Sequence, residues 1–154
     1  MNRTLFKKFA RCVTLVLATL SLLPLGGCIH QNTRMLSPSV TEPQLAKMRS
    51  FYVRKHAEDD YKLGEEIVSQ LQEMGYRATA GAAASPPAKV DGVITYMDRW
   101  TWDITMYMIS LDMQVREPGS DFALVTAKTV RTSTLRKSQK EMVRETLTKL
   151  LKNS

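Results

Sequence analysis

The hydrophobic pattern from residue 50 onward predicts a strand, a helix and a brief second strand. Residues 50–55 are rich in aromatic and β-branched side chains, which are typical of strands. Apolar residues then recur at helical spacing. They are Leu63, Ile67, Leu71 and Met74. We expect Asp59 or Asp60 to cap this helix, Gly75 to end it, and residues 76–79 to extend as a strand.

The second half of the chain predicts three strands and a final helix. The strands are expected at residues 90–97, 102–116 and 122–132. A loop is expected at 80–89, where alanines and prolines gather, and a turn at 117–121. Ser138 and Glu141 have the spacing of a capping box, which predicts the start of the final helix.

This order of elements predicts an α+β fold of the type β-α-β-β-β-α. Consecutive strands joined by short turns favour antiparallel pairing. We therefore expect an antiparallel sheet of about four strands, with two helices packed on one face as a two-layer sandwich. Residues 50–154 would form this single domain.

The predicted strand at 102–116 has two different faces. One is apolar over most of its length and should meet the helices, whereas the other is apolar only at its start. The candidate partner-binding patch on this second face is Trp100, Trp102, Ile104, Met106 and Met108. Tryptophan and methionine are enriched at interface cores, so their exposure would indicate a protein partner. The alternative is that the first strand, the alanine-rich loop or the segment before residue 50 covers them.

The amino terminus has the pattern of a signal peptide. Its first eleven residues include four basic residues and no acidic one. An apolar run then covers residues 13–23. That run is short for a membrane span, which takes roughly 20 apolar residues. It is followed by Leu25-Gly26-Gly27-Cys28, which resembles the lipobox of bacterial lipoproteins. The resemblance implies cleavage before Cys28 and lipidation of that cysteine with diacylglycerol and a further acyl chain such as palmitate. The alternative is an ordinary signal peptide or membrane anchor with a chance cysteine.

The resemblance divides the chain into three parts. Residues 1–27 would be a cleaved signal peptide and residues 28–49 a lipidated amino terminus and flexible tether, followed by the domain at 50–154. At about 3.3 Å per residue, such a tether would reach on the order of 70 Å. Ile29 follows the cysteine, where lipoproteins retained in the inner membrane of enteric bacteria tend to have aspartate. The expected location is therefore the periplasmic face of the outer membrane.

The predicted cleavage changes the charge and the thiol content. The whole chain has a net charge of +7, but removal of residues 1–27 leaves 18 basic and 15 acidic residues, a net charge near +3. This modest charge argues against a nucleic-acid partner and allows only weak contact with anionic lipid or polymer. Cys12 would be removed and Cys28 lipidated, so the mature domain would have no free thiol or disulfide.

Catalytic and metal-binding patterns are weak in this sequence. Asp98 and Asp103 could form a carboxylate pair beside Arg99, but a catalytic pair needs a cleft and a defined separation. His56 lies near Glu58 and two aspartates, an arrangement more typical of a solvated helix start than of a metal site. We therefore predict no enzyme activity, no catalytic residues, no metal and no cofactor. A cluster of Arg131, Arg136, Lys137 and Lys140 is a candidate contact for phosphates or carboxylates.

The sequence favours a non-catalytic lipoprotein that binds an unidentified protein partner in envelope assembly or maintenance. The order of elements resembles that of small α/β outer-membrane lipoproteins, such as the lipopolysaccharide-assembly lipoprotein and the activators of penicillin-binding proteins. This resemblance is one of topology, so it transfers no functional residues. Two alternatives remain. One is an inhibitor or immunity-type lipoprotein that blocks a periplasmic enzyme, and the other is a hydrolase with a pocket at Asp98, Arg99 and Asp103.

Overall fold

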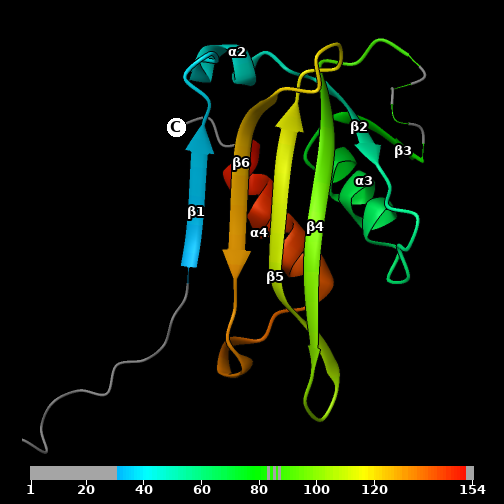
Figure 1. Cartoon of the computed structure of the whole chain (residues 1–154), viewed down its shortest axis with the longest axis vertical. Helices are drawn as coiled ribbons and strands as arrows, with labels where there is room; N and C mark the ends of the chain where they lie inside the picture. Colours follow the sequence, from blue (N-terminus) through cyan, green and yellow to red (C-terminus); the bar gives the residue numbers. More distant parts are fainter. Residues whose placement is uncertain (1–30, 83, 85, 87, 152–154) are drawn as a thin grey trace, which may run out of the picture.

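A six-stranded sheet runs through the part of the chain that the structure, a computed structural model, describes: residues 31–82, 84, 86 and 88–151 (Figure 1). The predicted signal peptide at 1–27 and Cys28 lie outside the described residues. The strands in chain order are β1 (Gln31–Leu36), β2 (Ser50–Arg54), β3 (Arg77–Gly81), β4 (Gly92–Trp102), β5 (Met106–Arg116) and β6 (Ala123–Val130). Their order across the sheet is β1-β6-β5-β4-β2-β3.

The sheet is mixed, so the prediction of about four antiparallel strands is wrong. β4, β5, β6 and β1 are antiparallel neighbours, whereas β2 runs parallel to both β3 and β4. Helix α3 (Leu63–Glu73) lies between β2 and β3 in the chain and returns it to the same end of the sheet, which makes the two strands parallel. The next connection carries β4 to the other side of β2, again in parallel.

The segment predicted to be a tether contains regular structure. Residues 31–36 form β1, which pairs along β6 from Gln31 opposite Val130 to Leu36 opposite Val125. A short helix follows, α2 (Glu42–Ala46), and an Arg34 guanidinium nitrogen donates to Glu42 over 2.8 Å. The interpretation of residues 28–49 as a flexible tether is therefore wrong from residue 31 onward. Its polar, aperiodic sequence concealed a strand at the sheet edge.

Two longer helices lie against the same face of the sheet. They are α3 and α4 (Gln139–Leu151), and Figure 1 shows both behind the strands. Two amides of the first turn of α3 donate to the Asp59 carboxylate, at 2.7 and 2.8 Å, and Gly75 follows the helix with a φ of +88°. The Ser138 amide donates to Glu141 over 2.9 Å, and the Glu141 amide donates back to the Ser138 hydroxyl. The predicted caps are confirmed.

The hydrophobic core lies between the sheet and these helices. Leu111, Met113 and Val115 of β5 are fully buried, as are Ile67 of α3 and Leu147 of α4. A 3-10 turn, η1 (Ser133–Leu135), connects β6 to α4. Among the described residues, no helix combines the length and apolarity needed to cross a membrane. We call the sheet face opposite α3 and α4 the open face.

Candidate functional site

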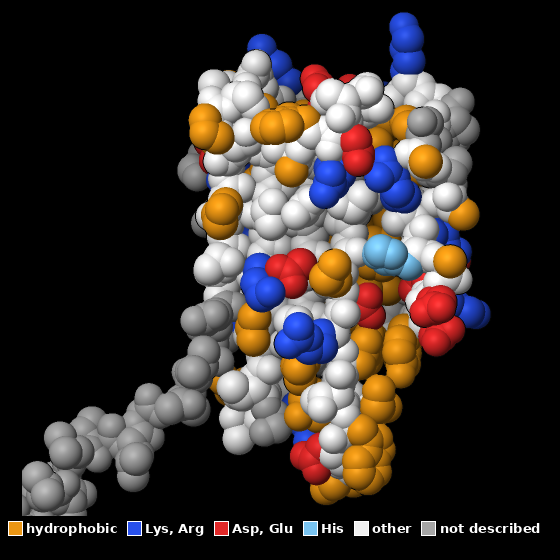
Figure 2. Space-filling model, in the orientation of Figure 1, with side chains coloured by type: hydrophobic (Ala, Val, Ile, Leu, Met, Phe, Trp, Pro, Cys, Tyr) orange, Lys and Arg blue, Asp and Glu red, His pale blue; other side chains and the backbone are white. Residues whose placement is uncertain are grey.

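The β4–β5 hairpin ends in exposed apolar side chains. Residues 103–105 connect the two strands, and the Asp103 amide donates to the Thr105 carbonyl over 3.3 Å. Around this turn, Trp102 is 73 % exposed, Ile104 85 % and Met106 47 %. Figure 2 shows hydrophobic side chains gathered at this lower end of the molecule. We call Trp102, Ile104 and Met106 the hairpin tip.

Met108 belongs to the core and not to the predicted patch. Arg99 pairs with Ser110 and Trp100 pairs with Met108, so Ile109 is an extra residue in β5. Such a bulge reverses the alternation of side chains beyond it. Met108 therefore points to the helix side, where it is only 1 % exposed. The prediction of which β5 side chains point toward the helices is correct for Leu111, Met113 and Val115. It is wrong for the residues that precede the bulge at Ile109.

Trp100 is half-buried and differs from Trp102. Its ring stacks on Tyr61, with centroids 4.0 Å apart and an interplanar angle of 20°. Its indole nitrogen donates to Asp98 over 2.5 Å. Tyr61 precedes α3, so this stack joins the hairpin to the helix layer. The predicted patch of five residues is thus reduced to the hairpin tip, with Trp100 at its base.

The two carboxylates of the hypothetical catalytic pair have separate partners. Asp98 accepts from Trp100, whereas Asp103 forms an ion pair with Arg136 over 2.5 Å. The Arg136 guanidinium also lies 4.1 Å from the centroid of the Tyr107 ring, a cation–π contact. Arg136 therefore ties the hairpin to the segment before α4. Asp98 and Asp103 therefore share no hydrogen-bond partner among the described residues.

All four residues of the candidate basic cluster form ion pairs. Arg131 is 3 % exposed and pairs with Glu145, which Lys137 also contacts at 2.8 Å. Lys140 pairs with Glu73 at 3.0 Å. Burial alone would raise the pKa of Glu145, but hydrogen bonds from Lys137, Lys149 and Arg131 hold that pKa well below its usual range. The cluster joins α4 to the sheet and is not a bare cationic surface.

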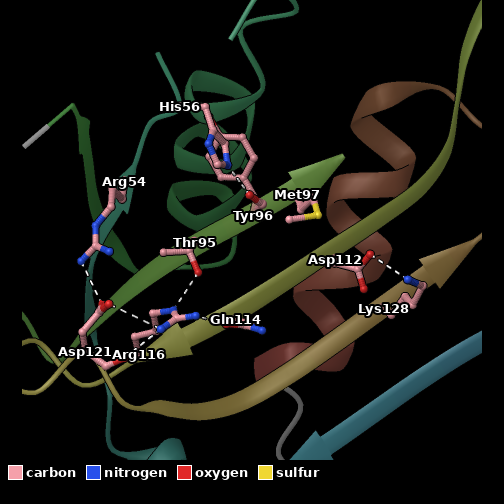
Figure 3. A pocket seen from close by; sticks show the side chains of 10 residues that line it. All are labelled: Arg54, His56, Thr95, Tyr96, Met97, Asp112, Gln114, Arg116, Asp121 and Lys128. Atoms are coloured by element: carbon pink, nitrogen blue, oxygen red, sulfur yellow. Dashed lines mark hydrogen bonds and ion pairs between the residues drawn. The ribbon is translucent and has the colours of Figure 1, made fainter. Parts of the chain in front are cut away.

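The open face holds a shallow depression of about 590 Å³, shown in Figure 3. Its lining comes from four strands and the turn after β5. The lining residues are Arg54, His56, Thr95, Tyr96, Met97, Asp112, Gln114, Arg116, Asp121 and Lys128. This site was not predicted from the sequence. A signal was present in the alternation of Asp112, Gln114 and Arg116 with the buried residues of β5.

The charges in this depression are paired with one another. Arg54 donates to Asp121 over 3.0 Å, and Arg116 donates to the Asp121 carbonyl over 2.8 Å. Lys128 donates to Asp112 over 2.9 Å. The hydrogen bond from Arg54 holds the pKa of Asp121 below its usual value. The result is a polar surface on which three cations share two carboxylates.

His56 lies at the rim of the depression and contacts Tyr96. A ring nitrogen of His56 bonds the Tyr96 carbonyl oxygen, and the two rings meet edge to face at 4.9 Å. The Tyr96 hydroxyl donates to Asp59 over 3.0 Å. Burial, followed by this hydrogen bond, raises the pKa of Tyr96 above its usual range. Within the described ranges, the histidines and acids form no group of three or more that could hold a metal ion.

Comparison with known proteins shows a similar fold in solved structures but does not assign the chain to a family. No family model and no curated protein matches the chain. A point variant of the PelC dodecamer from Paraburkholderia phytofirmans aligns with a TM-score of 0.56 and 10 % identity, covering 82 % of this chain and 100 % of that one. A second structure of that PelC dodecamer has a TM-score of 0.55, 9 % identity and the same coverage.

A PDZ domain protein from Parabacteroides distasonis aligns less well. Its TM-score is 0.47 at 10 % identity, over 86 % of this chain and 38 % of that chain. The likeness to PelC concerns the fold alone, because sequences so different need not share a function.

Proposed function

We propose that this protein is a lipid-anchored, non-catalytic binding or adaptor module of the bacterial cell envelope. The sequence Leu25-Gly26-Gly27-Cys28 supports the anchor through its resemblance to a lipobox. Two or more acyl chains on Cys28 would hold the protein stably in a membrane. Ile29 after the cysteine supports the periplasmic face of the outer membrane.

The observation that carries the binding role is the open face of the sheet, which no helix covers within the described residues. Met35 and Met97 are 71 % and 69 % exposed on it. They stand opposite Thr126 and Asp112 respectively, on the face away from the helices. Exposed methionines among polar groups suit a protein partner, since thioether side chains adapt to irregular surfaces. Charge pairs such as Lys128–Asp112 would add orientation more than affinity.

The partner is a second copy of the chain or a different envelope protein. The PelC structures that share the fold are dodecamers. Assembly between copies is therefore one outcome that the experiment must distinguish. A face built from several strands can serve either partner.

Site-specific crosslinking in intact cells tests the binding role. A photoreactive amino acid replaces Met97 on the open face, and a matched control replaces Thr148, which is exposed on α4. We expect protein adducts from position 97 and few from position 148. Mass spectrometry of the adducts separates a second copy from another protein. Equal or absent crosslinking at both positions would contradict a binding role for the open face.

Palmitate labelling tests the anchor separately. The full chain should incorporate labelled palmitate and remain in the membrane fraction. The Cys28→Ala variant should lose the label. Label retained by Cys28→Ala would contradict lipidation at this cysteine.

A further inference from the structure

We infer that the hairpin tip inserts into the interface of the same bilayer that holds Cys28. This inference rests on the proposed lipidation of Cys28. A lipid surface would then contact side chains for which the sequence pattern favours a protein partner. Three features of the molecule carry it: the short link from Cys28 to the sheet, the register of the strands, and the chemistry of the tip.

The first feature is the distance available between the anchor and the folded domain. Strand β1 begins at Gln31, three residues after Cys28. At about 3.3–3.6 Å per residue, this link spans at most about 11 Å. Gln31 must therefore stay close to the membrane surface whenever Cys28 is lipidated. A long tether would have left the orientation of the domain free, but β1 removes that freedom.

The start of β1 is also held firmly to the rest of the domain. Gln31 pairs with Val130 at the end of β6. Next to it, the Asn32 side-chain amide donates to Glu145 of α4 over 2.9 Å. The anchored end therefore moves with the sheet as one body.

The second feature is the strand register, which places the tip at the anchored end. Gln31, Val130, Ser110 and Arg99 form one row across four neighbouring strands. Beyond that row β4 and β5 continue alone, and the tip projects roughly 10 Å further, at about 3.3 Å for each of the three residues from Arg99 to Trp102. Figure 1 shows the hairpin extending past the start of β1 in the same direction.

The lateral separation is small as well. Three strand spacings of about 4.8 Å separate β1 from β4, or roughly 14 Å. The projection of the tip is similar to the greatest length of the link from Gln31 to Cys28. A bilayer surface through the anchor thus passes through or near the hairpin tip.

The third feature is the chemistry of the tip. Trp102 and Ile104 are the most exposed of its side chains, at 73 % and 85 %. Tryptophan prefers the membrane–water interface, where its ring is apolar and its N–H remains hydrated. The acidic side chain in this turn, Asp103, is neutralised by Arg136. Pairing lowers the cost of bringing that carboxylate toward a low-dielectric surface.

Tryptophan fluorescence in proteoliposomes tests the inference. The chain has two tryptophans, both in this hairpin. The Trp100→Phe variant, expressed from the full sequence and lipidated, retains only Trp102. It is reconstituted with brominated phosphatidylethanolamine and phosphatidylglycerol. Bromine on these lipids quenches indole fluorescence at close range. We expect loss of Trp102 emission relative to the same lipids without bromine. The matched Trp102→Phe variant retains Trp100, stacked on Tyr61, and should lose less.

A second measurement leaves both tryptophans unchanged. A photoreactive amino acid at Ile104 in the full chain should form adducts with phospholipid. Adducts with a second copy or with another envelope protein would overturn the inference. This test remains valid even if a tryptophan variant folds poorly.

The outcomes separate the inference from the proposed function. Palmitate on Cys28 together with quenching of Trp102 supports both. Palmitate on Cys28 without quenching overturns insertion of the tip and leaves the anchored adaptor intact. Absence of palmitate on Cys28 overturns the proposed anchor, and the inference that depends on it fails for that separate reason.

Discussion

The two halves of the β4–β5 hairpin contain similar side chains in opposite surroundings. Near β6 and α4, Met108 is 1 % exposed and Leu111 is fully buried. Beyond Met108, toward the turn, Met106 is 47 % exposed and Ile104 is 85 % exposed. The difference lies in what covers them, because the hairpin extends past the layer formed by α3 and α4 (Figure 1). Apolar residues in the first half stabilise the fold, and those in the second half remain available for an external surface.

The largest expected contrast is between two methionines of the same strand. Met108→Ala should lower the free energy of unfolding by about 3 kcal/mol, since it removes a buried side chain and leaves a cavity. Met106→Ala, two residues away, should change it by less than about 1 kcal/mol. Urea denaturation measures both. Equal losses would mean that the rest of the protein covers Met106 as fully as Met108.

Glu145 links the helix layer to the sheet at the boundary of the two halves. Glu145→Gln removes a carboxylate partner from buried Arg131 and should cost about 2 kcal/mol at neutral pH. Because the pKa of Glu145 lies below its usual value of 4.5 in the folded protein, its ionised form stabilises the fold above about that pH.

The contribution of Glu145 should decline as the pH falls below that value and the carboxylate becomes protonated. Denaturation of the wild type and Glu145→Gln at pH 7 and at progressively lower pH measures this. Glu58→Gln provides a control, because Glu58 is exposed and forms no ion pair within the described part of the chain. A difference between wild type and Glu145→Gln that grows with acid would contradict the assignment.

Gly92 shows how closely the covered half is packed. A Cβ at this position would lie 2.8 Å from the Val115 Cγ1 atom and 3.2 Å from the Phe51 ring. Gly92→Ala should therefore cost about 1.5 kcal/mol through overpacking. Gly119→Ala is the control, since its Cβ would meet nothing within 4 Å. Thermal melting of both variants should show a loss only for Gly92→Ala.

The smallest effect on stability is expected at the hairpin tip. Ile104→Ala should change the free energy of unfolding by less than about 0.5 kcal/mol, because Ile104 packs against little of the protein. The same substitution should weaken contact of the tip with lipid, seen as less quenching of tryptophan by brominated phospholipid. A stability loss comparable to that of Met108→Ala would show that the tip is covered in solution.

Much of the local structure could be predicted from the sequence. Helical spacing located α3 and α4, and the caps at Asp59 and Ser138 lie where the pattern indicated. The candidate site was predicted in part, since Trp102, Ile104 and Met106 are exposed. Met108 was misplaced because a bulge leaves no clear trace in the hydrophobic pattern.

The remaining differences arise from contacts between distant segments. β1 has no alternating apolar pattern, and it exists as a strand because β6 offers an unpaired edge about a hundred residues later. The parallel pairing of β2 with β3 and β4 depends on connections that return the chain to the same end of the sheet. The depression on the open face was missed because Arg54, Asp121 and Lys128 come together only through the sheet.

The sequence by itself determined the elements whose signals are local: amphipathic helices, caps, turns, and the motif that ends in Cys28. These depend on residues within a few positions of one another. Only the tertiary structure decided the order and direction of the strands, the burial of Met108 and the start of the sheet three residues after Cys28. These features depend on hydrogen bonds and packing between segments far apart in the chain. Because β1 starts so near Cys28, the proposed lipid anchor would constrain the orientation of the domain as well as its location.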